Sequence, residues 1–475
     1  MRRAKIVATI GPASKSPEIL QKLIQAGMDA ARLNFSHGDY ESHRQTIANI
    51  RKLSKALEKP VAILQDLQGP KIRTGQLENG TPVELIAGQH FVLTTNPVVG
   101  NKERVSTSYL ALPQDLQPGN RILLSDGLIE LKVLTTTSSG VECEVVAGGT
   151  LAENQGINLP KVDISVSSLT EKDIQDLEFG AEQEIDYLAL SFIRKPQDIL
   201  ELKERLAEKN SDTPVIAKLE KPMAIENLDA IMDVCEGVMI ARGDLGVEMA
   251  PEKVPVIQKH IIREANKKGK LVITATQMLE SMIHNPRPTR AEASDVANAV
   301  LDGTDAVMLS GETAVGQYPV ESVAMMANII REAEKMGAES QPERFREPKT
   351  LAFPEAVCDA AYHASKSIQA RAIVAFTQSG STARLISKYR PSTEILGLTP
   401  SSGIVNRMAL YWGVQPSSMQ AISNVDELIE ALEKLLLEQH QVRVGDNLII
   451  LTGAPIVEKG HTSLMKLHTV KQRKA

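Results

Sequence analysis

The stretch that decides the fold is a short apolar run that ends in polar residues: Gly237-Val238-Met239-Ile240-Ala241-Arg242-Gly243-Asp244. Residues 237–241 have the length and apolar character of a buried β-strand, and the residues after them predict the start of a helix. Seven further runs of this kind occur along the chain, with amphipathic stretches of helical length between most of them. The eight predicted strands are residues 4–10, 30–35, 61–66, 187–192, 215–220, 237–241, 271–276 and 306–310.

Strands and helices alternate in this pattern, with predicted helices at 18–26, 43–57, 199–209, 254–268 and 290–301. Eight strands that alternate with helices predict an α/β protein built on a closed (β/α)8 TIM barrel. An open doubly wound sheet is the competing architecture. The number of strands and the polar residues at their carboxyl ends favour the barrel.

Two further segments depart from the barrel pattern. Residues 70–167 lack helical periodicity, and Asp126-Gly127 between apolar runs is a hairpin signal. We expect an inserted all-β lid domain there, since insertions at the active-site face often close over the site.

Ser340–Pro348 has the composition of a linker, and α/β alternation resumes after it. The expected domains are the barrel at 1–69 and 168–340, the β-barrel lid at 70–167, and a C-terminal α/β regulatory domain at 341–475.

The composition excludes several classes of protein. With 53 Lys+Arg against 59 Asp+Glu, the net charge of -6 gives no general electrostatic reason to bind nucleic acid. The sequence lacks an uninterrupted apolar run of membrane-spanning length and a signal-peptide layout at its start, so we expect no membrane association. Cys143, Cys235 and Cys358 are scattered, which suits neither a disulfide framework nor a zinc site and predicts a reducing, cytoplasmic location.

Polar side chains gather at the carboxyl ends of six predicted strands. A single polar residue there is typical of a cap or a turn, but six coincident ends predict an active site. The residues concerned are Arg32, Asn34, Ser36 and His37; Asp66 with Lys71 and Arg73; Lys218 and Glu220; Arg242, Gly243 and Asp244; Thr276; and Ser310 with Glu312.

Glu220 and Asp244 end adjacent predicted strands. Two carboxylates so placed suit Mg²⁺, which keeps several waters and binds phosphate oxygens. The alternative is that the two carboxylates form salt bridges with Lys218 and Arg242. No His or Cys accompanies them, so zinc is disfavoured.

Lys218 lies two residues before Glu220 and therefore on the same face of the strand. Together with Mg²⁺ and Arg32 it would form a cationic pocket for a phosphoryl group and a developing enolate or carboxylate. A Schiff-base lysine, as in a barrel lyase, is the alternative. Backbone amides at Gly243-Asp244 could bind a substrate carboxylate, with the hydroxyl of Thr276 beside them.

In these motifs the chain resembles the pyruvate kinase family, and the resemblance covers essentially its whole length. The motifs occur in the family's order and are residues 5–12 (KIVATIGP), 32–38 (RLNFSHG), 239–246 (MIARGDLG), 275–282 (ATQMLESM) and 308–313 (MLSGET). The resemblance implies transfer of the phosphoryl group of phosphoenolpyruvate to ADP, giving pyruvate and ATP, usually by a homotetramer. A copy that had become a non-catalytic metabolite sensor should have lost Lys218, Glu220, Asp244 or Thr276, and all four are present.

The resemblance also implies roles for individual residues. Arg32 would bind the phosphoryl group, and Lys218 would stabilise that group and the enolate. Mg²⁺ or Mn²⁺ would be held by Glu220 and Asp244, and the substrate carboxylate by Gly243, Asp244 and Thr276. Asn34, His37 and Arg73 would lie near the nucleotide, and Thr276, Ser310 and Glu312 are the candidates for the proton relay.

Two residues, Lys71 and Gln155, depart from the pattern of many family members. In the family, Asn34, Ser36, Asp66 and the Leu67 carbonyl would hold K⁺, but this chain has Lys71 where K⁺-dependent members have Glu. A lysine there is a tethered monovalent cation, so we expect that K⁺ is not required; the alternative is that Lys71 points to solvent. Gln155 replaces a lysine that many relatives carry in the lid.

The segment Thr377-Gln378-Ser379-Gly380-Ser381-Thr382 follows a predicted strand and opens a predicted helix. Its hydroxyls and amides could hold a phosphate, or it could be an ordinary capped turn. In the family this loop binds the phosphate of an allosteric effector, so the implied effector residues are Thr377, Ser379, Gly380, Ser381 and Thr382.

Overall fold

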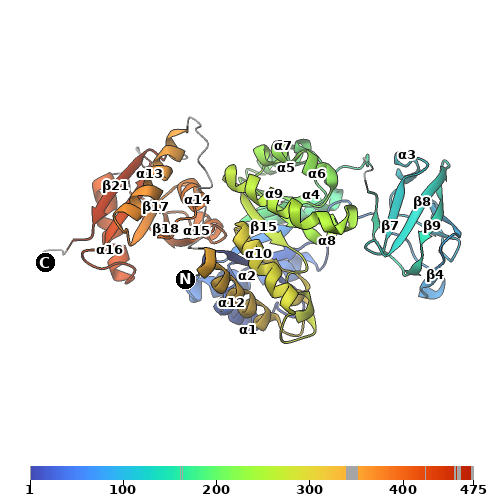
Figure 1. The fold of residues 1–475 in the computed structure, drawn as a ribbon, viewed down its shortest axis with the longest axis horizontal. Coiled ribbons are helices and arrows are strands. Elements are labelled where there is room, and N and C mark those ends of the chain that lie inside the picture. Colours follow the sequence, from blue (N-terminus) through green and yellow to red (C-terminus); the bar gives the residue numbers. More distant parts are fainter. Residues whose placement is uncertain are drawn as a thin grey trace. The chain divides into compact units, whose positions relative to one another are not determined.

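The computed structural model describes residues 2–160, 162, 164–337, 351–422, 424–453, 456 and 462–471. The predicted linker Ser340–Pro348 lies outside the described residues. The chain divides into two compact units, the first made of residues 1–65, 179–188 and 262–475 and the second of residues 66–178 and 189–261. Figure 1 gives the labels of the elements.

Eight strands form a closed barrel in the order β1-β16-β15-β14-β13-β12-β3-β2, which confirms the TIM barrel and decides against the open sheet. Its strands are β1 (Lys5–Ile10), β2 (Ala30–Asn34), β3 (Ala62–Asp66), β12 (Tyr187–Leu190), β13 (Val215–Leu219), β14 (Gly237–Ala241), β15 (Leu271–Ala275) and β16 (Ala306–Leu309). In the first unit Val7 pairs in parallel with Ala30 and Met308, and in the second Lys218 pairs with Met239.

Several strands end one or two residues earlier than the sequence pattern predicts. Residues Phe192 and Thr276 were expected inside strands, but their φ angles are 56° and 68°. A left-handed backbone cannot continue a strand, so the chain turns at these positions. Because both turns lie at the carboxyl ends of barrel strands, they fall where function is expected.

The helices begin and end at recognisable signals. Ser16 caps α1, and Thr289 with Glu292 forms a capping box at α10, which ends at Gly303 with φ 99°. The helices of the barrel chain are α1 (Pro17–Ala26), α2 (Tyr40–Ala56), α4 (Glu171–Glu182), α5 (Pro196–Glu208), α6 (Pro222–Glu226), α7 (Leu228–Val234), α8 (Arg242–Glu248), α9 (Val254–Lys267), α10 (Arg290–Asp302), α11 (Gly311–Ala314) and α12 (Pro319–Gly337), with short 3₁₀ turns η2 (Pro251–Lys253) and η3 (Glu280–Ile283).

The inserted segment folds into a six-stranded sheet, β11-β7-β8-β9-β5-β6, and a two-stranded sheet, β10-β4. Its strands are β4 (Val83–Leu85), β5 (His90–Thr94), β6 (Arg104–Ser106), β7 (Arg121–Leu124), β8 (Ile129–Thr136), β9 (Gly140–Ala147), β10 (Gly149–Leu151) and β11 (Ile157–Asn158), with η1 (Glu78–Gly80) and the four-residue helix α3 (Leu112–Asp115). Its own core includes Phe91, Leu93 and Leu131. The predicted hairpin turn has positive φ at Ser125, Asp126 and Gly127.

The C-terminal segment is a five-stranded sheet in the order β19-β18-β17-β20-β21, with β21 antiparallel to β20. The elements are α13 (Phe353–Ser367), β17 (Ala372–Phe376), α14 (Ser381–Lys388), β18 (Glu394–Thr399), α15 (Ser402–Met408), β19 (Val414–Ser418), α16 (Val425–Glu438), β20 (Asn447–Thr452) and β21 (Leu464–Thr469). Leu428, Leu432 and Leu436 of α16 pack on one face of the sheet. This confirms an α/β domain, although β19 was not predicted.

Within the first unit, a buried ion pair joins the C-terminal sheet region to the barrel chain. Arg390 Nη2 lies 2.6 Å from Asp305 Oδ1, next to β16, and the Arg390 guanidinium stacks 4.7 Å from the Trp412 ring centroid. Both charged side chains are about nine-tenths buried.

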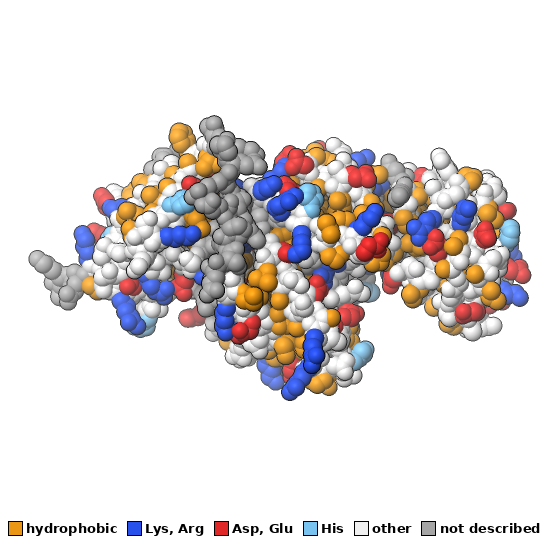
Figure 2. All heavy atoms as spheres, viewed as in Figure 1, with side chains coloured by type: hydrophobic (Ala, Val, Ile, Leu, Met, Phe, Trp, Pro, Cys, Tyr) orange, Lys and Arg blue, Asp and Glu red, His pale blue; other side chains and the backbone are white. Residues whose placement is uncertain are grey.

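Figure 2 shows positive and negative side chains mixed over the visible face, as the small net charge suggests. Among the described helices, none combines the length and apolarity that crossing a membrane requires.

Candidate active site

The side chain of Lys218, near the end of β13, is enclosed by acceptors. Its ammonium donates to Ser191 Oγ at 2.6 Å and lies 3.0 Å from Glu220 Oε1 and 3.2 Å from Asp66 Oδ1. The side chains of Lys218, Glu220 and Asp66 are 11%, 2% and 1% exposed. Charges taken out of water in this way are stable only when each has close partners, so the three groups hold one another in place.

Ser191 is a site residue that sequence reasoning missed. It follows β12 directly, and its hydroxyl donates to the Leu67 carbonyl at 2.8 Å while accepting from Lys218. The adjacent Phe192 amide donates to Glu220 Oε2 at 2.6 Å. The sequence contained a signal for this role, because Ser191 is a polar residue near the end of a predicted strand. The residues listed at the six other strand ends share that feature.

Glu220 and Asp244 are close enough to repel each other. Burial raises the pKa of Glu220, the Lys218 ammonium opposes that rise, and the negative charge of Asp244 adds to it. A divalent cation between them would relieve this repulsion, and two carboxylates with water and phosphate oxygens are a ligand set that Mg²⁺ accepts. Lys218 forms the salt bridge that this alternative expects for Glu220, and Arg242 Nη1 donates to Gln258 Oε1 at 3.3 Å. The described residues contain no cluster of three or more His, Cys, Asp or Glu suited to a metal.

Lys71 belongs to the same charged cluster. Burial lowers its pKa most, followed by the positive charges of Lys218 and Arg73, while Asp244 and Asp66 oppose the shift. The residue itself is partly buried. Lys71, Arg73, Asp244, Gln155 and Lys221 are among the residues that line a cavity of about 270 Å³. Within this cavity wall Arg73 Nη1 donates to the Asn154 carbonyl at 2.8 Å.

Gly243 and Asp244 lie in the first turn of α8, as predicted. Backbone amides in the first turn of a helix point toward its N-terminal end, where they can donate to an anion.

In the first unit, the turn after β15 is strained. Thr276 and Gln277 both have positive φ, 68° and 53°, which is costly for a β-branched residue. Glu312 stabilises this region, because one carboxylate oxygen accepts from the Leu279 amide at 3.0 Å and the other from the Ser310 amide at 2.7 Å. Its two oxygens thus connect the turns after β15 and β16.

The residues after β2 are also placed by hydrogen bonds within the first unit. Arg32 Nη1 donates to Thr9 Oγ1 at 3.0 Å, and Asn34 Oδ1 accepts from the Ser36 amide at 3.1 Å. The His37 carbonyl contacts His43 Nε2 at 3.0 Å. Arg32 is therefore oriented by β1.

The predicted effector loop has the expected strand-to-helix geometry. Gly380, with φ 83°, precedes α14, and its amide donates to Thr377 Oγ1 at 3.0 Å. The Ser379 hydroxyl donates to Ser381 Oγ at 3.1 Å, and Thr382 Oγ1 lies 2.6 Å from Thr462 Oγ1. Phosphate binding at this loop stays a prediction.

The fold is a closed barrel with an inserted β domain and a C-terminal α/β domain, and a lysine and carboxylates stand at the ends of the barrel strands. This combination is typical of a barrel phosphotransferase. The family models that match are the pyruvate kinase barrel domain over residues 1–323 and the pyruvate kinase alpha/beta domain over residues 355–468. The chain therefore belongs to the pyruvate kinase family.

Individual relatives agree with this assignment. The pyruvate kinase of Staphylococcus aureus strain MRSA252 is 47% identical over 476 residues, which is 99% of this chain and 81% of that protein, and strain USA300 gives the same values. A crystal structure of a pyruvate kinase from Cryptosporidium parvum superposes with a TM-score of 0.91 at 38% identity, covering 99% of this chain and 96% of that one. The chain is an ATP-forming phosphotransferase that converts phosphoenolpyruvate and ADP to pyruvate and ATP, the last step of glycolysis.

The contacts of Ser191 generate a prediction. Ser191→Ala removes an acceptor of the Lys218 ammonium, and a hydrogen bond to a charged group is worth about 1.5–3 kcal/mol. We expect turnover to fall by roughly tenfold or more while the variant still folds. Ser322→Ala is the matched control, because this buried serine of α12 donates to the carbonyl of Tyr318, the residue before the helix. Steady-state kinetics of both variants would contradict the role of Ser191 if their turnover fell equally.

Proposed function

We propose that Lys218 is the group whose positive charge stabilises the transferring phosphoryl group and the enolate left behind. The observation that supports this is its buried position, with a hydrogen bond to Ser191 and ion pairs with Glu220 and Asp66 that fix the ammonium. A fixed charge in a site with little water stabilises a transition state strongly, because no reorganisation is needed as the negative charge develops. Asp66 and Glu220 hold the ammonium, and Ser191 orients it.

We propose that Glu220 and Asp244 would hold Mg²⁺ or Mn²⁺. The ion, when bound, would supply positive charge to the phosphoryl and carboxylate oxygens of the substrate. The backbone amides of Gly243 and Asp244 would donate to the substrate carboxylate. Arg73 and Lys71 line the adjoining cavity and would contribute positive charge near the nucleotide.

The remaining roles rest on the family resemblance. Arg32 would bind the phosphoryl group, Thr276 would bind the carboxylate, and Asn34 and His37 would lie near the nucleotide. Thr276 and Ser310 would supply the hydroxyls of the proton relay, and Glu312 would position the turns that carry them. We also propose a cytoplasmic homotetramer, with a phosphorylated effector at residues 377–382. Cytoplasm suits the three buried cysteines, which are free thiols.

The first prediction of this function concerns Lys218. Lys218→Met keeps the length of the side chain and removes its charge, so turnover should fall by about a hundredfold or more. The half-saturating concentration of phosphoenolpyruvate should change less, because Arg32 and Mg²⁺ would still contact the substrate. Lys335→Met, at an exposed position on α12, is the control. Near-normal turnover of Lys218→Met would refute the assignment.

The second prediction concerns the carboxylate pair. If Asp244 binds Mg²⁺, Asp244→Asn should raise the Mg²⁺ concentration needed for half-maximal activity and lower the maximal rate. If Asp244 only balances neighbouring cations, the variant should lose stability while its Mg²⁺ dependence stays that of the parent. A titration of Mg²⁺ with parent and variant, alongside thermal unfolding, separates these two outcomes.

We further propose that the Lys71 ammonium takes the place of K⁺. The negative charges of Asp244 and Asp66 oppose the lowering of the pKa of Lys71 by burial, Lys218 and Arg73, which supports a Lys71 ammonium close to both carboxylates. A tethered ammonium needs no binding equilibrium and offers three donors to the same carboxylate that would otherwise contact the ion. The Asn34, Ser36, Asp66 and Leu67 site would then contribute little to activity.

The third prediction follows from this replacement. The enzyme should show substantial activity in a tetramethylammonium buffer without added K⁺. Lys71→Glu should depend strongly on KCl, while Lys71→Gln should lose activity that KCl restores less well, since it adds no carboxylate. An unmodified enzyme that stays inactive until KCl is added would overturn the proposal.

A further inference from the structure

The carboxylate of Glu248, at the end of α8, is buried in the second unit and has no part in the assignments above. Its Oε1 atom accepts a hydrogen bond from Asn158 Nδ2 at 3.1 Å and forms an ion pair with the Lys221 ammonium. Its Oε2 atom is also buried, and among the residues that the structure describes it has no hydrogen-bond partner. A buried acceptor without a donor costs stability, so stability alone does not account for a carboxylate at this position.

The three groups in this contact come from three separate segments of the chain. Asn158 ends β11 of the inserted segment, which pairs with β7. Lys221 directly follows Glu220, one of the two proposed Mg²⁺ ligands. Glu248 lies four residues after Asp244, the other proposed ligand, and residues four apart share one face of a helix. Glu248 therefore connects the inserted segment to both segments that carry the proposed ligands.

The inserted segment approaches α8 at a second point. At its hairpin turn, a side-chain carbon added to Gly127 would lie 3.5 Å from Cγ1 of Val247, the residue before Glu248. A cavity of about 1050 Å³ adjoins this contact, and its lining includes Gly127, Val247, Glu248 and Lys221. Side chains that border so large a space pack against fewer neighbours. The hydrogen bond of Asn158 therefore matters more than apolar packing for holding β11 to α8.

The position of β11 also bears on the cavity assigned to the nucleotide. Next to Asn158, the Ile157 amide donates to the Ile72 carbonyl at 2.9 Å. Ile72 stands between Lys71 and Arg73, two of the cations that line that cavity. A displacement of β11 would therefore move the backbone that carries these two cations.

The ion pair of Glu248 affects the charge at the metal site. An ammonium next to a metal-binding carboxylate repels a cation, and a carboxylate paired with that ammonium offsets the repulsion. The side chains of Lys221 and Glu248 are 14% and 1% exposed, so water and salt screen the pair weakly. Without Glu248, the positive charge of Lys221 would oppose the binding of a divalent cation at Glu220.

We propose that Glu248 is a positioning residue that couples the inserted segment to the metal site. Through Lys221 and α8, its carboxylate favours the arrangement of the two proposed ligands that binds a divalent cation. Through Asn158, it holds β11 in place. Metal binding then orders the inserted segment, and an ordered segment strengthens metal binding, because such coupling is reciprocal. This inference rests on the proposed role of Glu220 and Asp244 as Mg²⁺ ligands.

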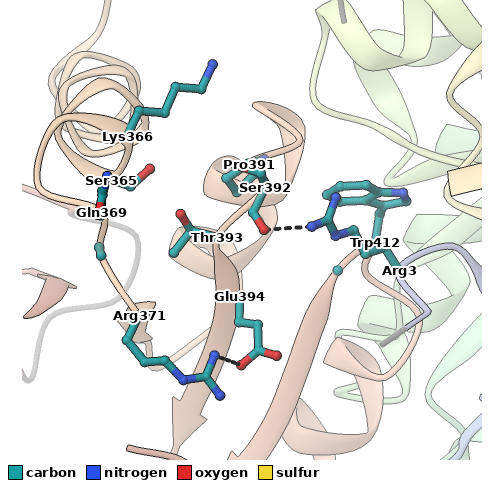
Figure 3. Close-up of a pocket in the computed structure, with 12 residues that line it drawn as sticks. Arg3, Ser365, Lys366, Gln369, Arg371, Pro391, Ser392, Thr393, Glu394 and Trp412 are labelled. Atoms are coloured by element: carbon teal, nitrogen blue, oxygen red, sulfur yellow. Dashed lines mark hydrogen bonds and ion pairs between the residues drawn. The ribbon is translucent and has the colours of Figure 1, made fainter. Parts of the chain in front are cut away.

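The test uses Mn²⁺ as the probe and the full chain without substrates. Calorimetry would measure the dissociation constant of Mn²⁺, and amide hydrogen exchange would follow residues 155–159 with and without saturating Mn²⁺. We compare Glu248→Gln, which keeps an acceptor but removes the charge, with Asn158→Ala, which removes only the contact of β11. Glu394→Gln is the matched control, because it removes a carboxylate that pairs with Arg371 at 2.7 Å in the first unit (Figure 3). Thermal unfolding checks that each variant is folded.

We expect Glu248→Gln to raise the dissociation constant of Mn²⁺ at least about fivefold, and Glu394→Gln to leave it unchanged. Mn²⁺ should slow the exchange of residues 155–159 in the parent and in the control. It should slow this exchange much less in Glu248→Gln and Asn158→Ala. A residue that only supports the fold would change stability without removing this response to the metal.

The variant Asp244→Asn separates this inference from the proposed function. If Asp244→Asn binds Mn²⁺ as the parent does, the assignment of the ligands is wrong and the coupling is overturned with it. If Asp244→Asn binds weakly while Glu248→Gln binds as the parent does, the ligands stand and the coupling is wrong. A parent whose exchange does not respond to Mn²⁺, or a response that persists in Asn158→Ala, would overturn the coupling even if Glu248→Gln failed to fold.

Discussion

The buried ammonium of Lys218 is the interaction on which the catalytic end of the barrel depends. Removing a charged group from water costs several kcal/mol, and that cost is offset only if partners stand at hydrogen-bonding distance from every side. Asp66, Ser191 and Glu220 come from the ends of three barrel strands and meet this condition. The register of those strands is therefore constrained by a charge, while the rest of each strand is constrained by apolar packing.

Buried carboxylates have a second use in this molecule. Glu220 accepts from the amide of Phe192, and Glu312 accepts from the amide of Leu279, three residues after Thr276. Phe192 and Thr276 both have a left-handed backbone that a side chain of their kind adopts only at a cost. The carboxylates stabilise turns that the local sequence alone would not form. Phe192 and Thr276 thereby keep a strained backbone at two strand ends.

Most of the architecture could be predicted from the sequence because its signals are local. The apolar runs at 237–241 and 215–220 have a length and composition that few other elements share. Ser191 was missed because a serine after a strand is usually a cap, and only the position of Lys218 in space shows its role. The strand β19 was missed because Pro416 removes an amide donor, which only an edge strand tolerates. What could not be predicted depends on contacts between residues far apart in the chain.

The charged contacts of Trp412 have a spectroscopic consequence. It is the only tryptophan in the chain, and it lies against the guanidinium groups of Arg3 and Arg390. Indole emission responds to nearby charge and to water, so the whole intrinsic fluorescence of the protein above the tyrosine band originates at one place. There Arg390, which lies between α14 and β18 of the C-terminal segment, pairs with Asp305 next to the last barrel strand. The molecule thus contains its own optical probe of how tightly these two regions are held together.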